Sequence, residues 1–359
     1  MFDSRDTGRS VPWGRAAAFA GLVCLGAAEC LAAKPGDFID RPPAWFAGDE
    51  AARVADTILS FQAETGGWPK NVSTVDAPFS GDRSRLRATY DNGATIDELR
   101  FLAGMVAATG HDRFRAAFDR GLQHVLEGQY ATGGWPQFHP PGSGYHRHIT
   151  FNDNAMVRIM QWLREVAGDD RYRFVDDAVR RRAAEAFDRG VACILACQIV
   201  IDGRRTAWCA QHDEIDLRPR PARSYELATL SGFESVGITR LLMSIDEPTP
   251  EVRAAVAGAV AWFERSALTG IRIDSVRDPR APRGFDRVVV EDPTAGPLWA
   301  RFYTLDTNQP VFADRDGVPR PRLADIGVER RTGYAWYGDQ PRKLLEVEAA
   351  RWRRRHAPP

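Results

Sequence analysis

The chain has 359 residues, 44 % of them hydrophobic, so it can bury a large core and does not have the composition of a disordered protein. Lysine and arginine together number 48, as do aspartate and glutamate, which gives a formal net charge of zero. This balance argues against nucleic acid as a partner, because no basic excess is present to displace counterions. A local group of arginines can still bind an acidic substrate.

The N-terminal segment has the features of an export signal. Three arginines precede an uncharged run rich in alanine, leucine and valine at 16–28, and small residues follow up to Ala33. The run is too short to cross a membrane. We therefore predict a signal peptide at 1–33, with export to the periplasm or the exterior. Residues 34–359 are then expected to form a single catalytic domain with no membrane segment, and we expect this mature chain to be a monomer. The alternative interpretation of residues 1–33 is a buried helix.

A sequence pattern recurs along the chain and predicts repeated helix pairs. Helical segments that end at Gln62, Gln129 and Gln198 are followed by AETGGWPKN, YATGGWPQF and IVIDGRRTAWCAQHD. The glutamines are 67 and 69 residues apart, a period that suits two antiparallel helices with their loops. A weaker fourth copy begins near 261–264.

Between these copies, apolar residues at intervals of three and four predict further helices at 95–109, 154–166 and 224–244. Alternating strand patterns are rare, and the best of them is 287–291. We therefore expect an all-α protein, an α/α toroid (an incomplete α/α barrel) of repeated helical hairpins with few short strands. The loops at one end of such a ring form a groove.

The GGWP turns are typical of helix ends, because glycine adopts the left-handed conformation there and proline prevents the helix from continuing. We interpret Gln62, Gln129 and these glycines as structural. Trp68 and Trp135 are in addition candidate platforms on which the apolar faces of sugar rings stack.

Each of the first two repeats carries an Asp-Asn pair before a periodic segment, Asp91-Asn92 in YDNGATIDEL and Asp153-Asn154 in ITFNDNAMVRI. Either pair alone is typical of a helix N-cap. Because the pairs occupy corresponding positions of adjacent repeats, we expect their side chains to converge. Two carboxylates and amide oxygens suit Ca²⁺, and water with an anionic substrate has to complete its roughly six to eight ligands.

Several basic residues are candidates for binding a carboxylate on a sugar. Arg223 lies at the start of the predicted helix 224–244, and Lys70 ends the first GGWPK turn. Arg301 lies among aromatic residues in LWARFY, and Arg315 lies in ADRDGVPR. A single arginine is most often a solvated surface group, but a guanidinium also offers a planar fork that matches a carboxylate.

The chain resembles the family 10 polysaccharide lyases through motifs in order across 51–339: GGWPKN, YDNGAT, GGWPQF, TFNDNAM, WCAQHD, ARSYELATLSGFES, WARFY and RRTGYAWYG. Members of this family are pectate lyases with an α/α toroid fold. They cleave polygalacturonate by Ca²⁺-assisted β-elimination and release 4,5-unsaturated oligogalacturonides. The segment 269–291 departs from the family pattern, and we expect a variable loop there.

The resemblance also implies roles for individual residues. It implies that Asp91 and Asp153 bind calcium and that Arg223 is the Brønsted base. It further implies substrate-carboxylate binding by three basic residues, Arg301, Arg315 and Lys70.

Two other functions are compatible with the residues. A glycoside hydrolase uses two carboxylates as acid and base, for which Asp97 and Glu98 are available, although they look like an exposed helical turn. A non-catalytic uronate-binding protein keeps the arginines and needs no Arg223 beside a cation. We interpret His212-Asp213 as a core or loop hydrogen bond rather than a catalytic dyad.

Overall fold

The computed structural model describes residues 33–356, so all of the predicted signal peptide except Ala33 lies outside the described residues. The part of the chain from Ala33 onward forms one compact unit. Within it, no helix combines the length and the hydropathy that a membrane crossing requires.

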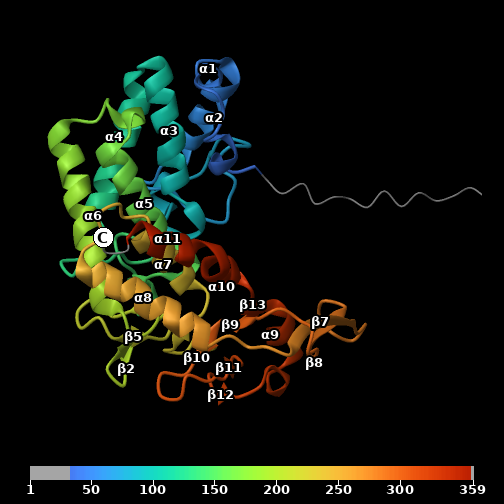
Figure 1. Cartoon of the computed structure of the whole chain (residues 1–359). Helices are drawn as coiled ribbons and strands as arrows, with labels where there is room; N and C mark the ends of the chain where they lie inside the picture. The colour runs from blue at the N-terminus through green and yellow to red at the C-terminus, as the bar shows by residue number, and fades with distance from the viewer. Residues whose placement is uncertain (1–32, 357–359) are drawn as a thin grey trace, which may run out of the picture. The chain divides into compact units, whose positions relative to one another are not determined.

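Helical hairpins form most of this unit, as the repeat predicts (Figure 1). Three helices, α3 (Ile96–Thr109), α5 (Ala155–Gly168) and α7 (Glu234–Met243), contact one another in chain order and are largely buried. Four helices form a second layer around them, namely α2 (Asp49–Ser60), α4 (Asp112–Glu127), α6 (Asp177–Cys197) and α8 (Pro250–Arg265). The predicted fold class, an α/α arrangement with short strands, is confirmed.

The remaining elements are short. The other helices are α1 (Pro43–Phe46), α9 (Val328–Gly333), α10 (Gln340–Lys343) and α11 (Ala349–Arg355). An antiparallel sheet joins β1 (Ile149–Thr150), β4 (Gln211–His212) and β5 (Pro219–Arg220). The two-residue strands pair as β2 (Val200–Ile201) with β3 (Arg204–Arg205), β6 (Leu230–Ser231) with β10 (Phe302–Tyr303), β9 (Trp299–Ala300) with β13 (Tyr337–Gly338), and β11 (Phe312–Ala313) with β12 (Pro319–Arg320).

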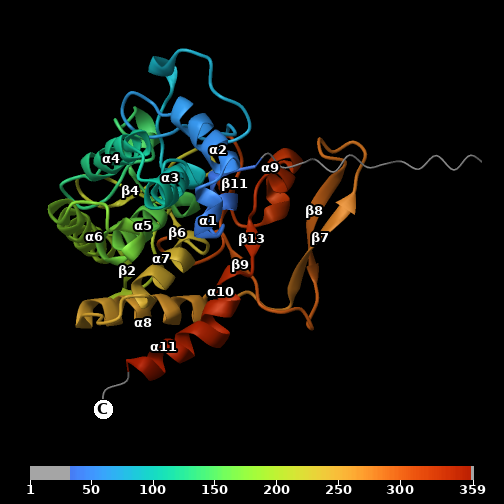
Figure 2. The same ribbon diagram turned by 90° about the horizontal axis from the view of Figure 1, so that it is seen from above.

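The predicted strand at 287–291 lies within β8 (Phe285–Glu291), which pairs with β7 (Ile271–Arg277) over its whole length. The segment expected to be a variable loop is therefore mainly a long β-hairpin. This hairpin projects from the helical layers in both views (Figures 1 and 2).

The recurring tryptophans fasten the outer helices. The indole N–H groups of Trp68, Trp135, Trp208 and Trp299 donate at 2.7–2.9 Å to the carbonyls of Ile58, Val125, Ile194 and Phe263, near the ends of α2, α4, α6 and α8. The fourth copy predicted near 261–264 is thus real, and its tryptophan is Trp299. Trp68 and Trp135 are fully buried. The prediction that they stack on sugar rings is wrong, because the helix layers enclose both rings.

The recurring glutamines connect successive repeats. Each side-chain amide donates to a carbonyl in its own turn and to one on the next outer helix: Gln62 to Gly66 and Ala117, Gln129 to Gly133 and Ala186, and Gln198 to Thr206 and Ala255. The structural interpretation of these residues is confirmed.

One predicted helix begins too early. Only α7, from Glu234, is helical in the segment predicted at 224–244. The backbone N–H of Ser231 donates to the carbonyl of Trp208 at 2.7 Å, so the chain before α7 is held extended in β6. Arg223 therefore lies in a turn, closed by the Glu226 N–H donating to the Arg223 carbonyl at 2.7 Å.

We predict that Gln62→Ala lowers the free energy of unfolding by about 2–4 kcal/mol, because two buried carbonyls lose their donor. Chemical denaturation measures the change. Gln123→Ala is the matched control, since Gln123 is exposed and only donates to Glu127 on its own helix at 2.6 Å. Equal effects of the two substitutions would contradict a role for Gln62 in joining the repeats.

Candidate functional site

Two short turns lie against each other at the start of α3 and α5. They are the 3₁₀ turns η3 (Asp91–Gly93) and η5 (Asn152–Asn154). In each, the middle residue has a left-handed backbone, with φ 55° at Asn92 and 51° at Asp153. The two turns are therefore built alike, and the repeat brings them together at one end of the inner helices.

This geometry corrects one sequence expectation. Asp91 and Asn152 are both buried first residues of their turns, whereas Asn92 and Asp153 are both exposed middle residues. Asp91 therefore corresponds to Asn152, and the expectation that Asp91 and Asp153 are equivalent is wrong by one residue. They are nevertheless close in space. Burial, as the main cause, raises the pKa of Asp153; Arg301 opposes the rise, and the charges of Glu234 and Asp91 add to it.

The Asp91 carboxylate is buried and only half satisfied. Its Oδ2 accepts from Gln137 Nε2 at 2.7 Å and is ion-paired with the Lys70 ammonium. Its Oδ1 has no hydrogen-bond partner among the described residues. Lys70 and Gln137 each follow the proline of a GGWP turn, so both repeats direct a side chain to the same acid. Gln137 occupies in the second repeat the position that Lys70 occupies in the first. This equivalence could have identified Gln137 as a site residue, but our sequence analysis missed it.

Gln137 is itself held in one orientation. Its Oε1 lies 2.6 Å from His146 Nδ1, and its Nε2 is the group that donates to Asp91. His146 Nδ1 must then carry the proton in this contact. Tyr145, next to His146, lies close enough to the same site for its charges to affect it. Burial is the main cause that raises the pKa of Tyr145; the charge of Arg223 lowers this pKa and the charge of Asp91 raises it.

Arg301 lies between the acidic groups. It is 8 % exposed, and its Nη2 donates to Glu234 Oε1 at 2.5 Å and to Asn152 Oδ1 at 3.2 Å. The same nitrogen is 3.6 Å from Asp153 Oδ1, and Asp153 Oδ2 accepts from Asn152 at 2.7 Å. Burial alone lowers the pKa of Arg301, but Glu234, Tyr334 and Asp153 raise it overall.

Glu234 is a third acid of the site that the sequence analysis missed. It begins α7, is 4 % exposed, and accepts a hydrogen bond from the Ser231 hydroxyl. Ser231 bonds to Trp208 as Thr89 does to Trp68 and Thr150 to Trp135. Glu234 therefore comes from the third repeat, three residues after Ser231, at the position where the second repeat supplies Asp153 three residues after Thr150.

Tyr334 brings the two predicted arginines together. The guanidinium carbons of Arg301 and Arg223 lie 4.7 Å and 5.7 Å from the centroid of its ring, within the range of cation–π attraction. Its hydroxyl donates to Glu226 Oε1 at 2.7 Å. Asp153, Arg301, Tyr334 and Arg223 thus form a continuous set of contacts.

Arg223 is half exposed and ion-paired. Its Nε donates to Glu226 Oε2 at 2.7 Å, and its Nη2 contacts Glu226 Oε1. The hydrogen bond and charge of Glu226 raise the pKa of Arg223, against the lowering effect of burial. No hydrogen bond of Nη1 to the described residues is present. The guanidinium is therefore fixed on one edge and available on the other.

Arg315 does not contact this set. Its side chain is 65 % exposed and pairs with Glu329, with Nη2 to Oε1 at 3.0 Å. Glu329 also pairs with Arg330, whose guanidinium carbon lies 4.4 Å from the Tyr225 ring. Among the described residues, the contacts that lead from Arg315 to Arg223 pass through Glu329, Arg330 and the Tyr225 ring, which also contacts the Arg223 guanidinium.

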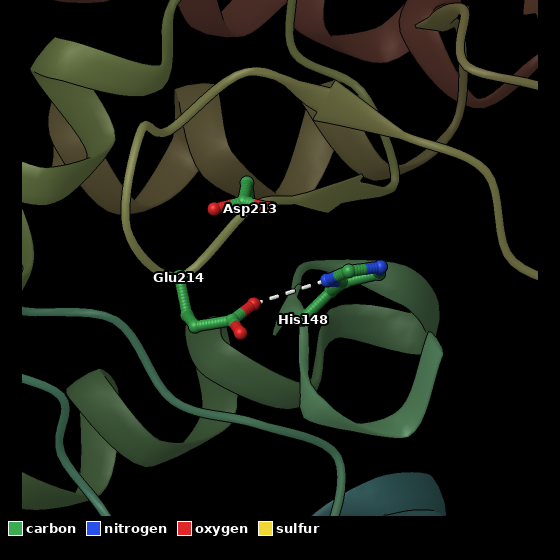
Figure 3. A group of neighbouring side chains, drawn as sticks. All are labelled: His148, Asp213 and Glu214. Carbon is green, nitrogen blue, oxygen red and sulfur yellow. Dashed lines mark hydrogen bonds and ion pairs between the residues drawn. The ribbon is translucent and has the colours of Figure 1, made fainter. Parts of the chain in front are cut away.

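A second group of possible metal ligands lies at the edge of the β1–β4–β5 sheet (Figure 3). His148, Asp213 and Glu214 offer atoms within 4.8 Å of one another, and His148 Nδ1 is 3.1 Å from Glu214 Oε2. The carboxylates are already satisfied, however. Arg147 pairs with Glu214, and Arg220 Nε donates to Asp213 at 2.8 Å. These contacts join neighbouring strands, and we assign no metal to them.

Asp213 and His212 have ordinary structural roles. Burial raises the pKa of Asp213, but backbone N–H groups and Arg220 lower it to about 2 overall. His212 is fully buried; its Nδ1 donates to the Leu217 carbonyl at 2.8 Å and its Nε2 accepts from the Cys209 N–H at 3.1 Å. Burial lowers the pKa of His212 to about 4. The interpretation of this pair as a structural hydrogen-bonding unit is confirmed.

The description of Asp97 and Glu98 as an exposed turn is wrong. Glu98 is 3 % exposed and accepts from the Thr74 hydroxyl at 2.9 Å, while the Asp97 side chain is 19 % exposed. Burial, opposed by the Thr74 hydrogen bond, raises the pKa of Glu98 from 4.5 to about 7. The folded chain therefore favours its protonated form.

Glu98→Gln should make the protein relatively more stable as pH rises. A raised pKa contributes stability that is fully present below the unfolded value of 4.5 and is lost as pH passes about 7. The non-titrating variant escapes this loss, so its advantage should grow by about 3 kcal/mol between pH 4 and pH 9. Denaturation at several pH values, with exposed Glu185→Gln as control, measures it. A constant difference would contradict the burial argument.

Comparison with known proteins identifies relatives of this arrangement. A model of the pectic acid lyase family matches residues 62–345. A solved family 10 polysaccharide lyase from Cellvibrio cellulosa is 36 % identical over 86 % of this chain and 96 % of its own, with a TM-score of 0.74. An aspartate-to-alanine mutant of a family 10 polysaccharide lyase from the same organism, in complex with trigalacturonic acid, is 35 % identical over 88 % and 98 %, with a TM-score of 0.73. Among curated proteins, none matches the chain.

Proposed function

Because this chain belongs to the pectic acid lyase family and is a polysaccharide lyase, we propose that it cleaves polygalacturonate by Ca²⁺-assisted β-elimination. The observation that carries the proposal is the contact set from Asp153 through Arg301 and Tyr334 to Arg223, beside the half-satisfied Asp91. Family membership argues against the hydrolase and the non-catalytic binding protein. The proposed reaction is tested by measuring the ultraviolet absorbance of products that contain a C4–C5 double bond.

Asp91 and Asp153 are the proposed calcium ligands. The buried Oδ1 of Asp91 lacks a partner among the described residues, as a buried carboxylate rarely does without a ligand. Asp153 is 44 % exposed and lies in the turn that contacts the turn of Asp91. Hard oxygen donors of this kind fit Ca²⁺. When bound, the ion supplies positive charge that neutralises the substrate carboxylate and makes the neighbouring C5 proton more acidic.

Arg301 is the proposed anchor for a sugar carboxylate. Glu234 and Asn152 occupy only its Nη2, and its buried Nε has no partner among the described residues. A carboxylate pairs more strongly with a buried guanidinium than with a guanidinium that is exposed to water. Lys70 adds a second positive charge beside Asp91. Arg315 is a proposed outer contact, because its side chain remains exposed next to the Tyr225 side of the site.

Arg223 is the proposed base. It removes the C5 proton; the electron pair of the broken C5–H bond forms the C4–C5 double bond, and the C4–O4 bond breaks with its pair leaving on O4. The departing O4 takes a proton from solvent and Arg223 returns its own to solvent, and the product is a 4,5-unsaturated oligogalacturonide. Since Glu226 raises the pKa of Arg223, the neutral guanidine is scarce and becomes more abundant as pH rises.

We further propose that residues 1–33 direct the chain to the periplasm or the exterior, where a polymeric substrate is accessible, and that the mature protein is a monomer. A single chain contains every residue of the proposed site. Neither nucleic acid nor a membrane is needed as a partner.

Arg223→Lys should reduce kcat on polygalacturonate about a thousandfold, because lysine keeps the charge but loses the fork that pairs with Glu226. Ultraviolet absorbance of the unsaturated product measures the rate. The wild-type rate should also rise continuously from pH 7 into the alkaline range. Arg220→Lys, three residues away and bound to Asp213, is the control. A rate maximum below neutral pH would exclude a guanidine base.

Asp153→Asn should raise the calcium concentration for half-maximal activity at least about tenfold and abolish the increase in Tm that calcium gives to the wild type. Thermal unfolding with and without chelator is the readout independent of turnover. Asp213→Asn is the matched control in the other acidic cluster. Loss of the calcium response in the Asp213 variant alone would place the ion in that cluster instead.

A further inference from the structure

The tip of the β7–β8 hairpin carries a concentration of positive charge. Between paired Arg277 and Phe285, the sequence contains Arg280 and Arg283 and a single acid, Asp278. All three arginines are exposed, and the Arg280 side chain is 94 % exposed. The tip therefore has two positive charges in excess within a chain whose formal net charge is zero.

These arginines differ from those at the base of the hairpin. Arg272 is held by two carboxylates, Asp274 at 2.9 Å and Asp292 at 3.0 Å. At the tip, Asp278 is 3.6 Å from Arg280, and no ion pair joins Arg277 or Arg283 to any residue of the range 33–356. Like charges that stay unpaired on one loop repel each other, so an anionic ligand would stabilise them.

The backbone of the loop that carries these charges is restrained. Pro279 and Pro282 restrict its backbone. The Asp278 N–H donates to the Gly284 carbonyl at 3.0 Å, and the Gly284 N–H donates to the Ala281 carbonyl at 2.9 Å. Little backbone conformational entropy is then lost when the tip binds a ligand.

The tip is also attached to the wall of the proposed catalytic site. Arg331 of α9 donates from Nε to Asp286 at 2.8 Å, and Arg287 donates from Nη1 to the Tyr334 carbonyl at 3.0 Å. Tyr334 is the ring that contacts Arg223 and Arg301. Asp286 and Arg287 directly follow the tip. The tip arginines therefore lie only a few residues along the chain from the contacts with Arg331 and Tyr334.

We propose that residues 277–285 form an accessory docking surface for the stretch of acidic polysaccharide that extends beyond the catalytic site. The inference rests on the proposed function for the identity of this polyanion. A polyuronate carries a carboxylate on every sugar, and several spaced guanidinium groups attract it over the length of a chain. A short oligosaccharide that fills only the catalytic site does not reach them.

The test is a triple variant, Arg277→Gln, Arg280→Gln and Arg283→Gln. Its dissociation constant for polygalacturonate, from native electrophoresis in gels containing the polymer and chelator, should rise at least about fivefold. KM for polygalacturonate should rise similarly, while kcat and the kinetics on trigalacturonate remain unchanged. The effect should disappear at high salt, because exposed charges are screened.

A second triple variant, Arg351→Gln, Arg354→Gln and Arg355→Gln, is the control, since it removes the same charge from exposed positions on α11. Equal loss of binding in both variants, or unchanged binding of the tip variant, would overturn the proposal. Loss of trigalacturonate kinetics would place the tip in the catalytic site. If the wild type lacks lyase activity, the proposed reaction fails, and gel retardation still decides the docking surface by itself.

Discussion

Three of the four buried tryptophans of the repeat connect the core to the candidate site. The indole of Trp68 donates to the end of its outer helix, and its backbone carbonyl accepts from Thr89, two residues before Asp91. Trp135 and Trp208 make the same pair of bonds ahead of Asp153 and Glu234. A side chain that closes the helix layers thereby also fixes where each acid lies. The positions of these acids consequently depend on the packing of the buried tryptophans.

The positive and negative charges of the candidate site nearly cancel, with one negative charge in excess. Four acids, Asp91, Asp153, Glu226 and Glu234, are in contact with three cations, Lys70, Arg223 and Arg301. A site with one excess negative charge repels a polyuronate. Addition of a divalent cation at the two aspartates reverses the sign, so binding of calcium and of an anionic sugar are expected to support each other. On the proposed function, this coupling would account for the combination of acids and guanidinium groups in one site.

The sequence predicted those features that follow from local periodicity. Helices α3 and α5, strand β8 and the turns with Asp91 and Asp153 lie close to their expected positions. Features set by tertiary packing were missed. Nothing in the GGWP motif distinguishes a buried tryptophan from a sugar platform, and the tie between Ser231 and Trp208 delays α7 by ten residues. Glu98 looked exposed because the loop that carries Thr74, which covers it, is distant in sequence.

The pairing of Arg223 with Glu226 has two opposing effects on the proposed role of Arg223 as a base. Glu226 fixes the side chain at its Nε and Nη2 edge, while Tyr334 holds Glu226 through its hydroxyl. The same carboxylate raises the pKa of Arg223, which makes the neutral form rarer but intrinsically more basic. A second cation near Arg223 acts in the other direction, because it disfavours the charged guanidinium. On the proposed function, a cation held by Asp91 and Asp153 would both make the substrate proton more acidic and favour the neutral form of Arg223, while Arg223 stays paired with Glu226.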